Sequence, residues 1–376
     1  MEKSGFPKHL LEQPVKERTE YFTNYTMAHP HLVKAFQTLM RAIYKAPGTS
    51  LIFVVGATGV GKTTLLRRLV QKLNEAALPQ LEIHKGKIPV FGVEAKSPEF
   101  SQFDWKDFYI RLLKAVNEPL IDKKITYEDE KVNERDSKAK WRRAVESALI
   151  NRNPDAFYID EAHHLALLSS GQKLKDQPEV LKSLANLANT KIILTGTYDL
   201  LPLIDLGDQL CRRTKTVHFQ RYHPEYSIDE KSFKNLLKTF EQQLPLSNTP
   251  DLEKHWEFLY ERSIGCVGML KDWLSETLEY VLEQDEHART ITLKDLQLHA
   301  RPVSQCLKII KAVKVGEQKL QDSEQEIDEL RRELRLIQNR EETNLNKEFN
   351  NQNNQVEKTN KTIGKPKPIR YKVGQD

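Results

Sequence analysis

The sequence predicts an α/β fold in which a parallel sheet carries helices on both faces, followed by a small all-helical domain and a C-terminal extension that is first helical and then disordered. Two observations lead to this prediction. Short apolar runs alternate with segments of helical spacing through the first 225 residues, which is the order that a parallel sheet covered on both faces requires. A glycine-rich turn also follows the first apolar run directly, as a phosphate-binding loop between strand and helix does.

The glycine-rich turn is the run Gly56–Thr63, which fits the pattern G-x-x-x-x-G-K-[ST] and follows the apolar residues 51–55. Its backbone N–H groups can turn inward around an anion, and the next helix adds the positive end of its dipole. Lys62 can reach the outer phosphates of ATP, and Thr63 supplies a hydroxyl for Mg²⁺. The alternative is that this is a glycine-rich strand-to-helix turn that binds no ligand. The predicted nucleotide-binding residues are Gly56, Thr58, Gly59, Val60, Gly61, Lys62, Thr63 and Thr64.

The remaining elements of the sheet follow in order. Four further strand-like runs lie at 88–93, 156–159, 191–194 and 216–219. The segments with helical spacing between them lie at about 64–78, 104–117, 137–150 and 177–189. Together they predict one nucleotide-binding domain.

Two acidic residues, Asp160 and Glu161, end the third strand-like run. Carboxylates are costly at the end of a buried strand unless a cation or a polarised water balances them. In P-loop NTPases the first acid holds Mg²⁺, and the second is placed to orient and deprotonate the attacking water. These roles predict ATP hydrolysis. The alternative is that the pair only caps the next helix, whose N-terminus favours negative charge.

Two further features complete the predicted catalytic site. Thr195 ends the fourth run and could hydrogen-bond the attacking water or the γ-phosphate, although Thr195–Asp199 could also be a simple turn and helix cap. Arg212 and Arg213 precede the fifth run. They could reach a neighbouring copy's site and stabilise charge on the transferred phosphoryl group. Their alternative role is plain surface charge.

The segment from about 226 to 300 predicts a helical domain, because apolar residues recur there at helical spacing. These stripes indicate core packing. Thr292 and Asp295 have the spacing of residues that cap the start of a helix. The remaining boundaries are an N-terminal lead-in over 1–45, a nucleotide-binding domain over 46–225, the helical domain over 226–302, a charged helix within 303–345 that runs from Glu317 to about Glu342, and a basic tail over 346–376.

The order of these motifs resembles the AAA+ ATPases, and within them the TniB/TnsC family of transposition target-selection regulators. The more specific signals are Tyr21–Pro30, Leu194–Thr197 and Gly265–Trp273. In the family, the last segment is the lid motif, whose glycines open a helix that faces the nucleotide. Many AAA+ proteins carry an arginine on this helix, whereas here the nearest cation is Lys271, which leaves the coupling of lid and nucleotide open.

The polar stretch Lys123–Arg143 is the predicted DNA contact, because it carries eight Lys/Arg against five Asp/Glu, a net +3, with Tyr127 and Trp141 interleaved. Lysines there would neutralise phosphates without reading bases. A solvated helical face of mixed charge is the alternative. The resemblance favours contact with double-stranded DNA through Lys96, Lys123, Lys124, Thr126, Lys138 and Lys140.

Composition adds few constraints. The formal charge of +5 is mild for 376 residues and does not by itself indicate nucleic acid. No run approaches the roughly 20 apolar residues of a membrane span, and the N-terminus lacks the apolar core of a secretory signal. We therefore expect a cytoplasmic protein with no membrane partner. Three dispersed cysteines suggest neither disulfides nor zinc, and we expect all of them to be buried: Cys211, Cys266 and Cys306.

The resemblance implies a bacterial, DNA-associated ATPase of slow turnover that oligomerises on double-stranded DNA in its ATP state, marks a target site and recruits or activates a transposase. Hydrolysis would then disassemble the ring or filament. A target-selection protein is a further implied partner, and whether it is guided by RNA, as in CRISPR-associated transposons, stays open. The tail over 346–376, with seven Lys/Arg against three Asp/Glu, could dock the transposase or merely aid solubility. Two alternatives are a scaffold or signalling ATPase of secretion-type machinery and a helicase or its loader.

Overall fold

A computed structural model describes residues 5–97, 103–119, 121, 134–166, 172–204 and 211–336 of the chain. The chain separates into two compact units, Met1–Leu320 and Gln321–Asp376. The first unit contains the sheet, the helical domain and everything that bears on the candidate site.

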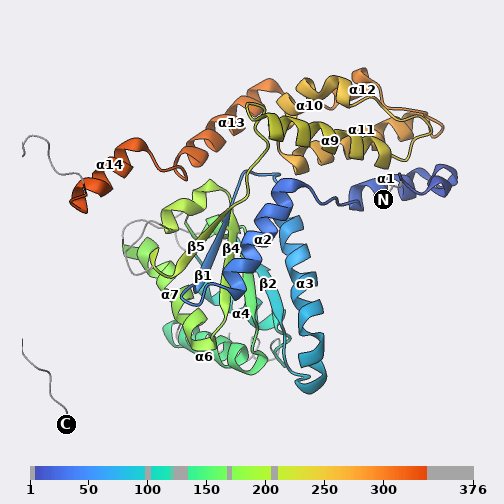
Figure 1. Cartoon of the computed structure of the whole chain (residues 1–376). Helices are drawn as coiled ribbons and strands as arrows, with labels where there is room; N and C mark the ends of the chain where they lie inside the picture. Colours follow the sequence, from blue (N-terminus) through green and yellow to red (C-terminus); the bar gives the residue numbers. More distant parts are fainter. Residues whose placement is uncertain are drawn as a thin grey trace, which may run out of the picture. The chain divides into compact units, whose positions relative to one another are not determined.

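A five-stranded sheet, parallel throughout, forms the centre of the first unit (Figure 1). Its strands are β1 (Leu51–Val55), β2 (Val90–Glu94), β3 (Ala156–Asp160), β4 (Lys191–Gly196) and β5 (Thr214–His218). The strand order is β2-β3-β4-β1-β5, which confirms the predicted α/β class. Because β1 lies between β4 and β5, the loop that follows β1 emerges beside the ends of both neighbours.

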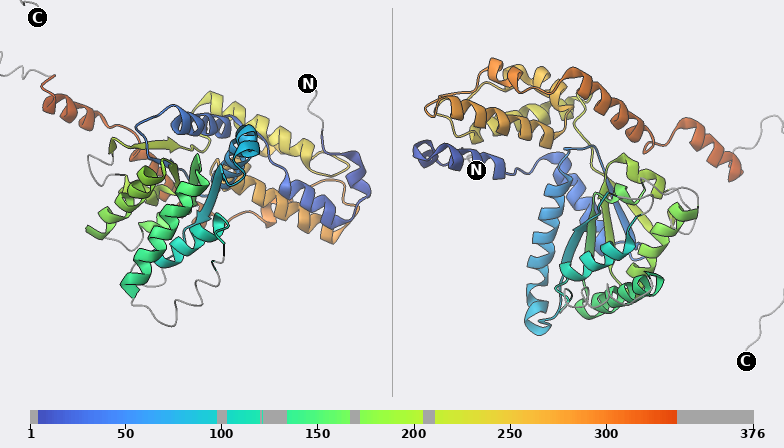
Figure 2. Two further views of the ribbon diagram at one scale, coloured as in Figure 1. Left: turned by 90° about the horizontal axis from the view of Figure 1, so that it is seen from below. Right: turned by 180° about the vertical axis from the view of Figure 1, so that it is seen from behind.

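Helices cover both faces of the sheet (Figures 1 and 2). All five residues of β1 are buried, because the strand has helices above and below it. The helices on one face are α2 (Pro30–Tyr44) and α3 (Lys62–Ile83). Those on the other face are α4 (Trp105–Ala115), α6 (Glu134–Arg152) and α7 (Gln172–Ala188). The described residues also include four short 3-10 helices: η1 (Lys8–Glu12), η2 (Ala162–Leu165), η3 (Tyr198–Leu203) and η4 (Glu253–His255).

The helical domain, called the lid below, consists of α9 (Ser227–Gln243), α10 (Trp256–Ser263), α11 (Val267–Gln284) and α12 (Leu293–Leu298). Its core includes the predicted stripes, with Phe233, Leu270 and Leu274 each at most 1% exposed. Thr292 and Asp295 form a reciprocal capping box at the start of α12, as their spacing predicts.

The N-terminal segment is divided between the two cores. Helix α1 (Val15–Asn24) packs against α11 and contributes Phe22 to the core of the lid. Arg18 is buried there, and its guanidinium donates to the carbonyl oxygens of Pro245 and Glu286 at 2.8 Å each. Helix α2, by contrast, packs on the sheet. The segment predicted as a lead-in over 1–45 is thus shared between the core of the lid and that of the sheet.

The charged segment also differs from its prediction. It contains two helices, α13 (Val303–Gln318) and α14 (Glu324–Glu333), where one helix from Glu317 to about Glu342 was expected. The chain begins a new helix at Ser323, whose side chain and that of Glu326 cap each other's backbone. Helix α13 lies in the first unit and packs against η3 and α10. The predicted tail over 346–376 lies outside the described residues.

Cysteine burial matches the expectation at two of three positions. Cys266 and Cys306 are buried, but Cys211 is exposed. Cys211 lies at the end of a helical turn, just before the turn over 212–213 that leads into β5. The expectation for Cys211 was therefore wrong.

Candidate functional site

The glycine-rich loop lies at the carboxyl edge of the sheet, between β1 and α3. Gly59 and Gly61 have φ angles of 74° and 110°, a left-handed conformation that side chains with a Cβ rarely adopt. At Gly56, a Cβ would come within 2.4 Å of the Phe219 carbonyl oxygen. The loop therefore requires glycine at all three positions, which is the condition for a backbone cradle that approaches an anion closely.

Lys62 begins α3 and folds back over the loop. Its Nζ donates to the carbonyl oxygens of Gly56 and Ala57, each at 3.0 Å, and only 8% of the residue is exposed. Burial lowers the pKa of Lys62, while the nearby carboxylates of Glu161 and Asp160 act to raise it. The ammonium group is thus held against the loop by two neutral carbonyl oxygens. A phosphate that binds in the loop would have to replace only these two partners.

Asp160 and Thr195 meet across the ends of adjacent strands. The Thr195 hydroxyl, which is fully buried, donates to Asp160 Oδ1 at 2.5 Å, and the Glu161 amide donates to the same oxygen at 3.0 Å. Two donors on one oxygen fix the orientation of this carboxylate. They leave its other oxygen available for a hard cation, which takes oxygen ligands. Thr195 therefore contacts Asp160, the candidate Mg²⁺ ligand, directly.

Glu161 occupies an unusual backbone position. Its φ of 49° places a non-glycine residue in the left-handed region, where strain commonly marks a functional site. Its side chain is 39% exposed, and Oε2 lies 3.1 Å from Nδ1 of His163, although the two atoms do not form a hydrogen bond. Burial, aided by the neighbouring His164, lowers the pKa of His163. A neutral imidazole beside Glu161 leaves the carboxylate free to accept a proton from water.

The lid reaches the loop through the start of α11. The amide of Gly268 donates to the Gly59 carbonyl oxygen at 2.7 Å, and a Cβ at Gly268 would lie 2.5 Å from that oxygen. Lys271, one turn further along, donates from Nζ to the Thr23 carbonyl oxygen at 2.6 Å. Burial lowers the pKa of Lys271. The lid motif therefore lies against the phosphate-binding loop, and Lys271 joins it to the N-terminal segment.

A small pocket opens where the N-terminal segment, the loop and the lid meet. Its lining is Tyr25, Thr26, Met27, His29, Leu32, Val60, Gly61, Thr64, Phe240, Val267, Gly268 and Lys271. The predicted residues Val60, Gly61, Thr64 and Lys271 are among them, but sequence reasoning did not assign Tyr25, Met27 or His29 to the site. The only signal for them was their position in the stretch Tyr21–Pro30, which the resemblance singled out. Their position beside the loop follows from the fold, because α1 packs on the lid and α2 on the sheet.

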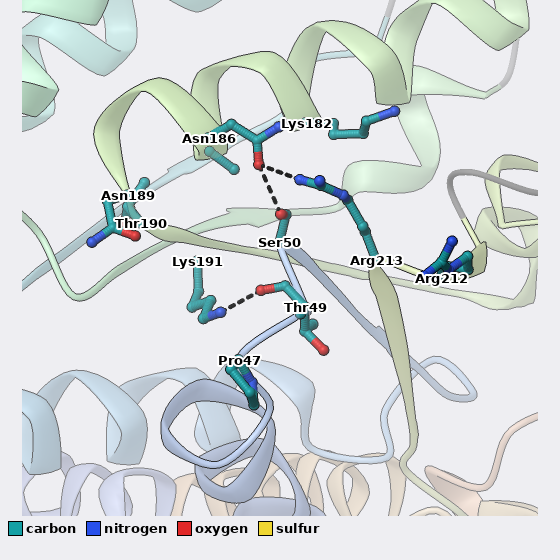
Figure 3. A pocket seen from close by; sticks show the side chains of 12 residues that line it. Pro47, Thr49, Ser50, Lys182, Asn186, Asn189, Thr190, Lys191, Arg212 and Arg213 are labelled. Atoms are coloured by element: carbon teal, nitrogen blue, oxygen red, sulfur yellow. Dashed lines mark hydrogen bonds between the residues drawn. The ribbon is translucent and has the colours of Figure 1, made fainter. Parts of the chain in front are cut away.

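The arginine pair lies at the opposite, amino edge of the sheet (Figure 3). An open pocket of about 800 Å³ is lined by the starts of β1, β4 and β5 and by the last turns of α7. Arg213 Nη1 donates to Asn186 Oδ1 at 3.0 Å. Arg212 is exposed and makes no hydrogen bond or ion pair with any residue that the structure describes. The pair is therefore remote from the phosphate-binding loop of its own chain.

The predicted DNA contacts are only partly described. Lys96 is exposed, with Nζ 3.8 Å from Asp107 Oδ1, and Lys138 and Lys140 are exposed on α6. Trp141 does not join them, because it is 4% exposed and packs into the core beneath the sheet. Trp141 therefore belongs to the core and not to the exposed basic face of α6. The other three candidates lie outside the described residues: Lys123, Lys124 and Thr126.

No group of three or more His, Cys, Asp or Glu side chains in the described ranges could hold a metal ion. A Mg²⁺ site needs only one or two protein oxygens beside phosphate and water, and Thr63 with Asp160 fits that requirement. No helix within the described ranges combines the length and apolar character of a membrane span.

The sheet topology and the geometry of the loop place this chain in the class of proteins with an AAA-domain P-loop ATPase fold. Residues 46–204 match the family model described as an AAA domain. No curated protein matches the chain.

Three solved structures are similar to it. A Walker-type ATPase of Pyrococcus abyssi is 18% identical, with a TM-score of 0.43, over 80% of this chain and 75% of that one. The Aeropyrum pernix ORC2 protein in ADPNP–ADP complexes is 14% identical, with a TM-score of 0.48, over 76% and 71%. Drosophila ORC bound to DNA is 11% identical, with a TM-score of 0.45, over 76% and 64%. None of these scores reaches a level that bears on function.

Proposed function

We propose that this chain is an ATP-dependent regulator of transposition that assembles on double-stranded DNA, marks a target site and recruits or activates a transposase. The observation that carries the ATPase part is the meeting of the loop, the Asp160–Thr195 pair and the lid at one edge of the sheet. The DNA and transposase parts are supported by the motifs that resemble the TniB/TnsC regulators: Tyr21–Pro30, Leu194–Thr197 and Gly265–Trp273.

In this proposal, the residues of the site divide the work of ATP hydrolysis. The loop amides and Lys62 hold the β- and γ-phosphates, and the pocket beside Tyr25 and His29 receives the base. Thr63 and Asp160 would hold Mg²⁺, which neutralises phosphate charge. Thr195 acts on the phosphates through Asp160, because its hydroxyl is hydrogen-bonded to that carboxylate.

Glu161 is the general base of the proposed reaction. It accepts a proton from water as the water oxygen bonds to the γ-phosphorus, and the bond from that phosphorus to the β-bridging oxygen breaks. The products are ADP and inorganic phosphate. An arginine from a neighbouring copy meets the charge that develops on the transferred group. Turnover would therefore depend on assembly, and hydrolysis would disassemble the polymer.

The first experiment is negative-stain electron microscopy of the purified protein with duplex DNA, without nucleotide, with ADP and with a non-hydrolysable ATP analogue. We expect rings or filaments on DNA with the analogue only. Lys62→Ala should abolish them, and Glu161→Gln should stabilise them with ATP. Lys72→Ala, which removes an exposed lysine of the same helix, is the matched control. Assemblies that form with ATP but ignore DNA would instead favour a scaffold ATPase, and strand displacement would favour a helicase.

The DNA surface has its own test. Replacing Lys138 and Lys140 with glutamate should weaken duplex binding for all sequences alike and reduce its salt dependence by about one unit of slope per lost phosphate contact. Lys16→Glu is the control, because this lysine lies on α1, more than 100 residues before α6 in the sequence, and its side chain is 84% exposed. Unchanged binding by the α6 variant would remove this helix from the DNA interface.

A further inference from the structure

Helix α14 carries an apolar stripe on an otherwise polar surface. Ile327, Leu330 and Leu334 are 36%, 58% and 58% exposed, and Leu334 is the C-cap residue of the helix. Every other residue of the helix is charged or polar. Residues three and four apart lie on one face of a helix, so the three side chains form one stripe, which we call the α14 seam. Single exposed leucines need no explanation, but an aligned set on a charged helix indicates a surface that a partner covers.

The helix is also short for one that stands by itself. It has 10 residues, whereas isolated helices of fewer than about 12–15 residues are marginal in water. A capping box between Ser323 and Glu326 closes its first turn. This cap satisfies backbone amides but covers none of the seam. Packing of the seam against a second helix would supply stability that the local contacts do not.

The spacing of the seam indicates which kind of helix fits it. Ile327 and Leu334 are seven residues apart, and Leu330 follows Ile327 by three. These are the first and fourth positions of a coiled-coil repeat, where isoleucine followed by leucine favours two parallel strands. Every copy of this chain presents the same seam, so a second α14 is a partner of matching shape.

The charges beside the seam fit a parallel pair. Glu326 flanks the seam on one side and Arg331 on the other, at the positions that face each other between the two helices of a parallel coiled coil. Each pair therefore gains two contacts between Glu326 of one copy and Arg331 of the other. In an antiparallel pair, Glu326 would face Glu333 along one edge and Glu324 would face Arg331 along the other. Repulsion would then offset attraction, so the charges favour the parallel arrangement.

We propose that the α14 helices of two copies pair in parallel through the seam when both copies belong to one assembly. This inference rests on the proposed function, because three apolar side chains per helix are too few to join free copies: stable interfaces bury roughly 1,200–2,000 Å². Within an assembly the helices meet at a high effective concentration. Both charged partners are accessible. The ion pair of Arg331 with Asp328 is 3.6 Å long between exposed side chains, and the cap on Ser323 uses only Oε2 of Glu326.

Disulfide trapping tests the contact and its direction. Ile327→Cys is made in a Cys211→Ser background, which removes the exposed native cysteine. The full chain is assembled on duplex DNA with a non-hydrolysable ATP analogue and then oxidised with diamide. A parallel pair brings the two 327 positions together, so a covalent dimer should form, and its yield should fall about tenfold without the analogue. Arg332→Cys, on the opposite face of the helix, is the matched control and should stay monomeric.

An antiparallel pair would give a different pattern. Its two 327 positions would lie about 10 Å apart along the axis, at roughly 1.5 Å per residue, which exceeds the roughly 4.4–6.8 Å between the Cα atoms of a disulfide. Ile327→Cys copies would then cross-link only to Leu334→Cys copies. That result would overturn the parallel pairing.

Charge reversal provides a second measurement. Arg331→Glu should raise the protein concentration needed for half-maximal assembly about twofold to fivefold, as the loss of an exposed ion pair does. Arg332→Glu makes the same change of charge on the far face and should leave that concentration unchanged. Normal assemblies that yield no Ile327→Cys dimer, or an equal yield from Arg332→Cys, would overturn the inference and leave the proposed function intact. If no assembly forms with the ATP analogue, the proposed function fails and the inference fails with it.

Discussion

The Arg221–Glu317 ion pair is the contact for which the structure gives the sharpest prediction of how its removal changes stability. Arg221 lies in the linker between β5 and α9, and Glu317 lies in the last turn of α13, 96 residues away. The pair is bidentate, with Nε–Oε1 at 3.0 Å and Nη2–Oε2 at 3.2 Å, and the side chains are 6% and 9% exposed. Arg221 also donates to the Tyr260 hydroxyl at 2.9 Å. The pair thus joins α13 to the linker and the lid.

Glu317→Ala would leave the guanidinium of Arg221 buried with only neutral partners. Removing one partner of a buried pair commonly destabilises a protein by about 3–5 kcal/mol, because the remaining charge is uncompensated. Replacing both residues with apolar side chains of similar size, Arg221→Met with Glu317→Leu, removes both charges. We expect that double variant to lie within about 1 kcal/mol of the wild type or above it, since such replacements are often neutral or stabilising.

Urea unfolding, followed by tryptophan fluorescence, measures these differences. Glu329→Ala is the control, because it removes an exposed carboxylate of α14 and should change the free energy of unfolding by less than about 0.5 kcal/mol. A Glu317→Ala variant whose free energy of unfolding lies within about 1 kcal/mol of the wild type would contradict this prediction, as would a double variant as unstable as the single one.

The same contact should depend on pH through His223, whose Nε2 lies 3.4 Å from Glu317 Oε1. The hydrogen bond to Glu317 raises the pKa of His223 above its ordinary 6.5. Burial acts to raise the pKa of Glu317, but hydrogen bonds from His223 and Arg221 outweigh it and hold this pKa below 4.5. The His223 contribution is therefore complete below pH 6.5 and lost as pH rises through its folded pKa. The Glu317 contribution is present above pH 4.5 and lost as pH falls through its folded pKa. The effect of Glu317→Ala should be larger at pH 6 than at pH 8.

Three further predictions concern the site. Gly268→Ala should weaken ATP binding at least tenfold in a titration with a fluorescent nucleotide, because its Cβ would lie 2.5 Å from the Gly59 carbonyl oxygen; affinity equal to the wild type would show that the lid yields easily. Thr195→Val should lower ATPase turnover and raise the Mg²⁺ concentration needed for half activity, because it removes a donor to Asp160, whereas a normal Mg²⁺ requirement would refute the positioning role. Burial lowers the pKa of His29 from 6.5 to about 4, so the neutral form contributes stability that is complete above pH 6.5 and falls by about 3 kcal/mol as pH drops to 4. His29→Gln should flatten this part of the pH–stability curve, and an unchanged slope would contradict the assignment.

The sequence by itself determined the parts of the site that are contiguous. The loop over 56–63 and the acids at 160–161 carry their chemistry in adjacent residues, and the apolar runs around them predicted each strand to within two or three residues. Local spacing suffices there because a strand end and a helix start set the direction of neighbouring side chains. The lid stripes and the Thr292 cap were predictable for the same reason.

Only the tertiary structure decided the contacts between distant residues. Strand order and register brought Thr195 to Asp160 and left Arg213, but not Arg212, beside Asn186. Packing of α6 against the sheet, rather than local charge, turned Trp141 inward. The pairing of Glu317 with Arg221 across 96 residues has no local signal, because a charged residue in an amphipathic helix has the same pattern whether it meets water or a buried partner. Such choices depend on which surfaces the folded chain brings together, and spacing along the sequence does not encode that.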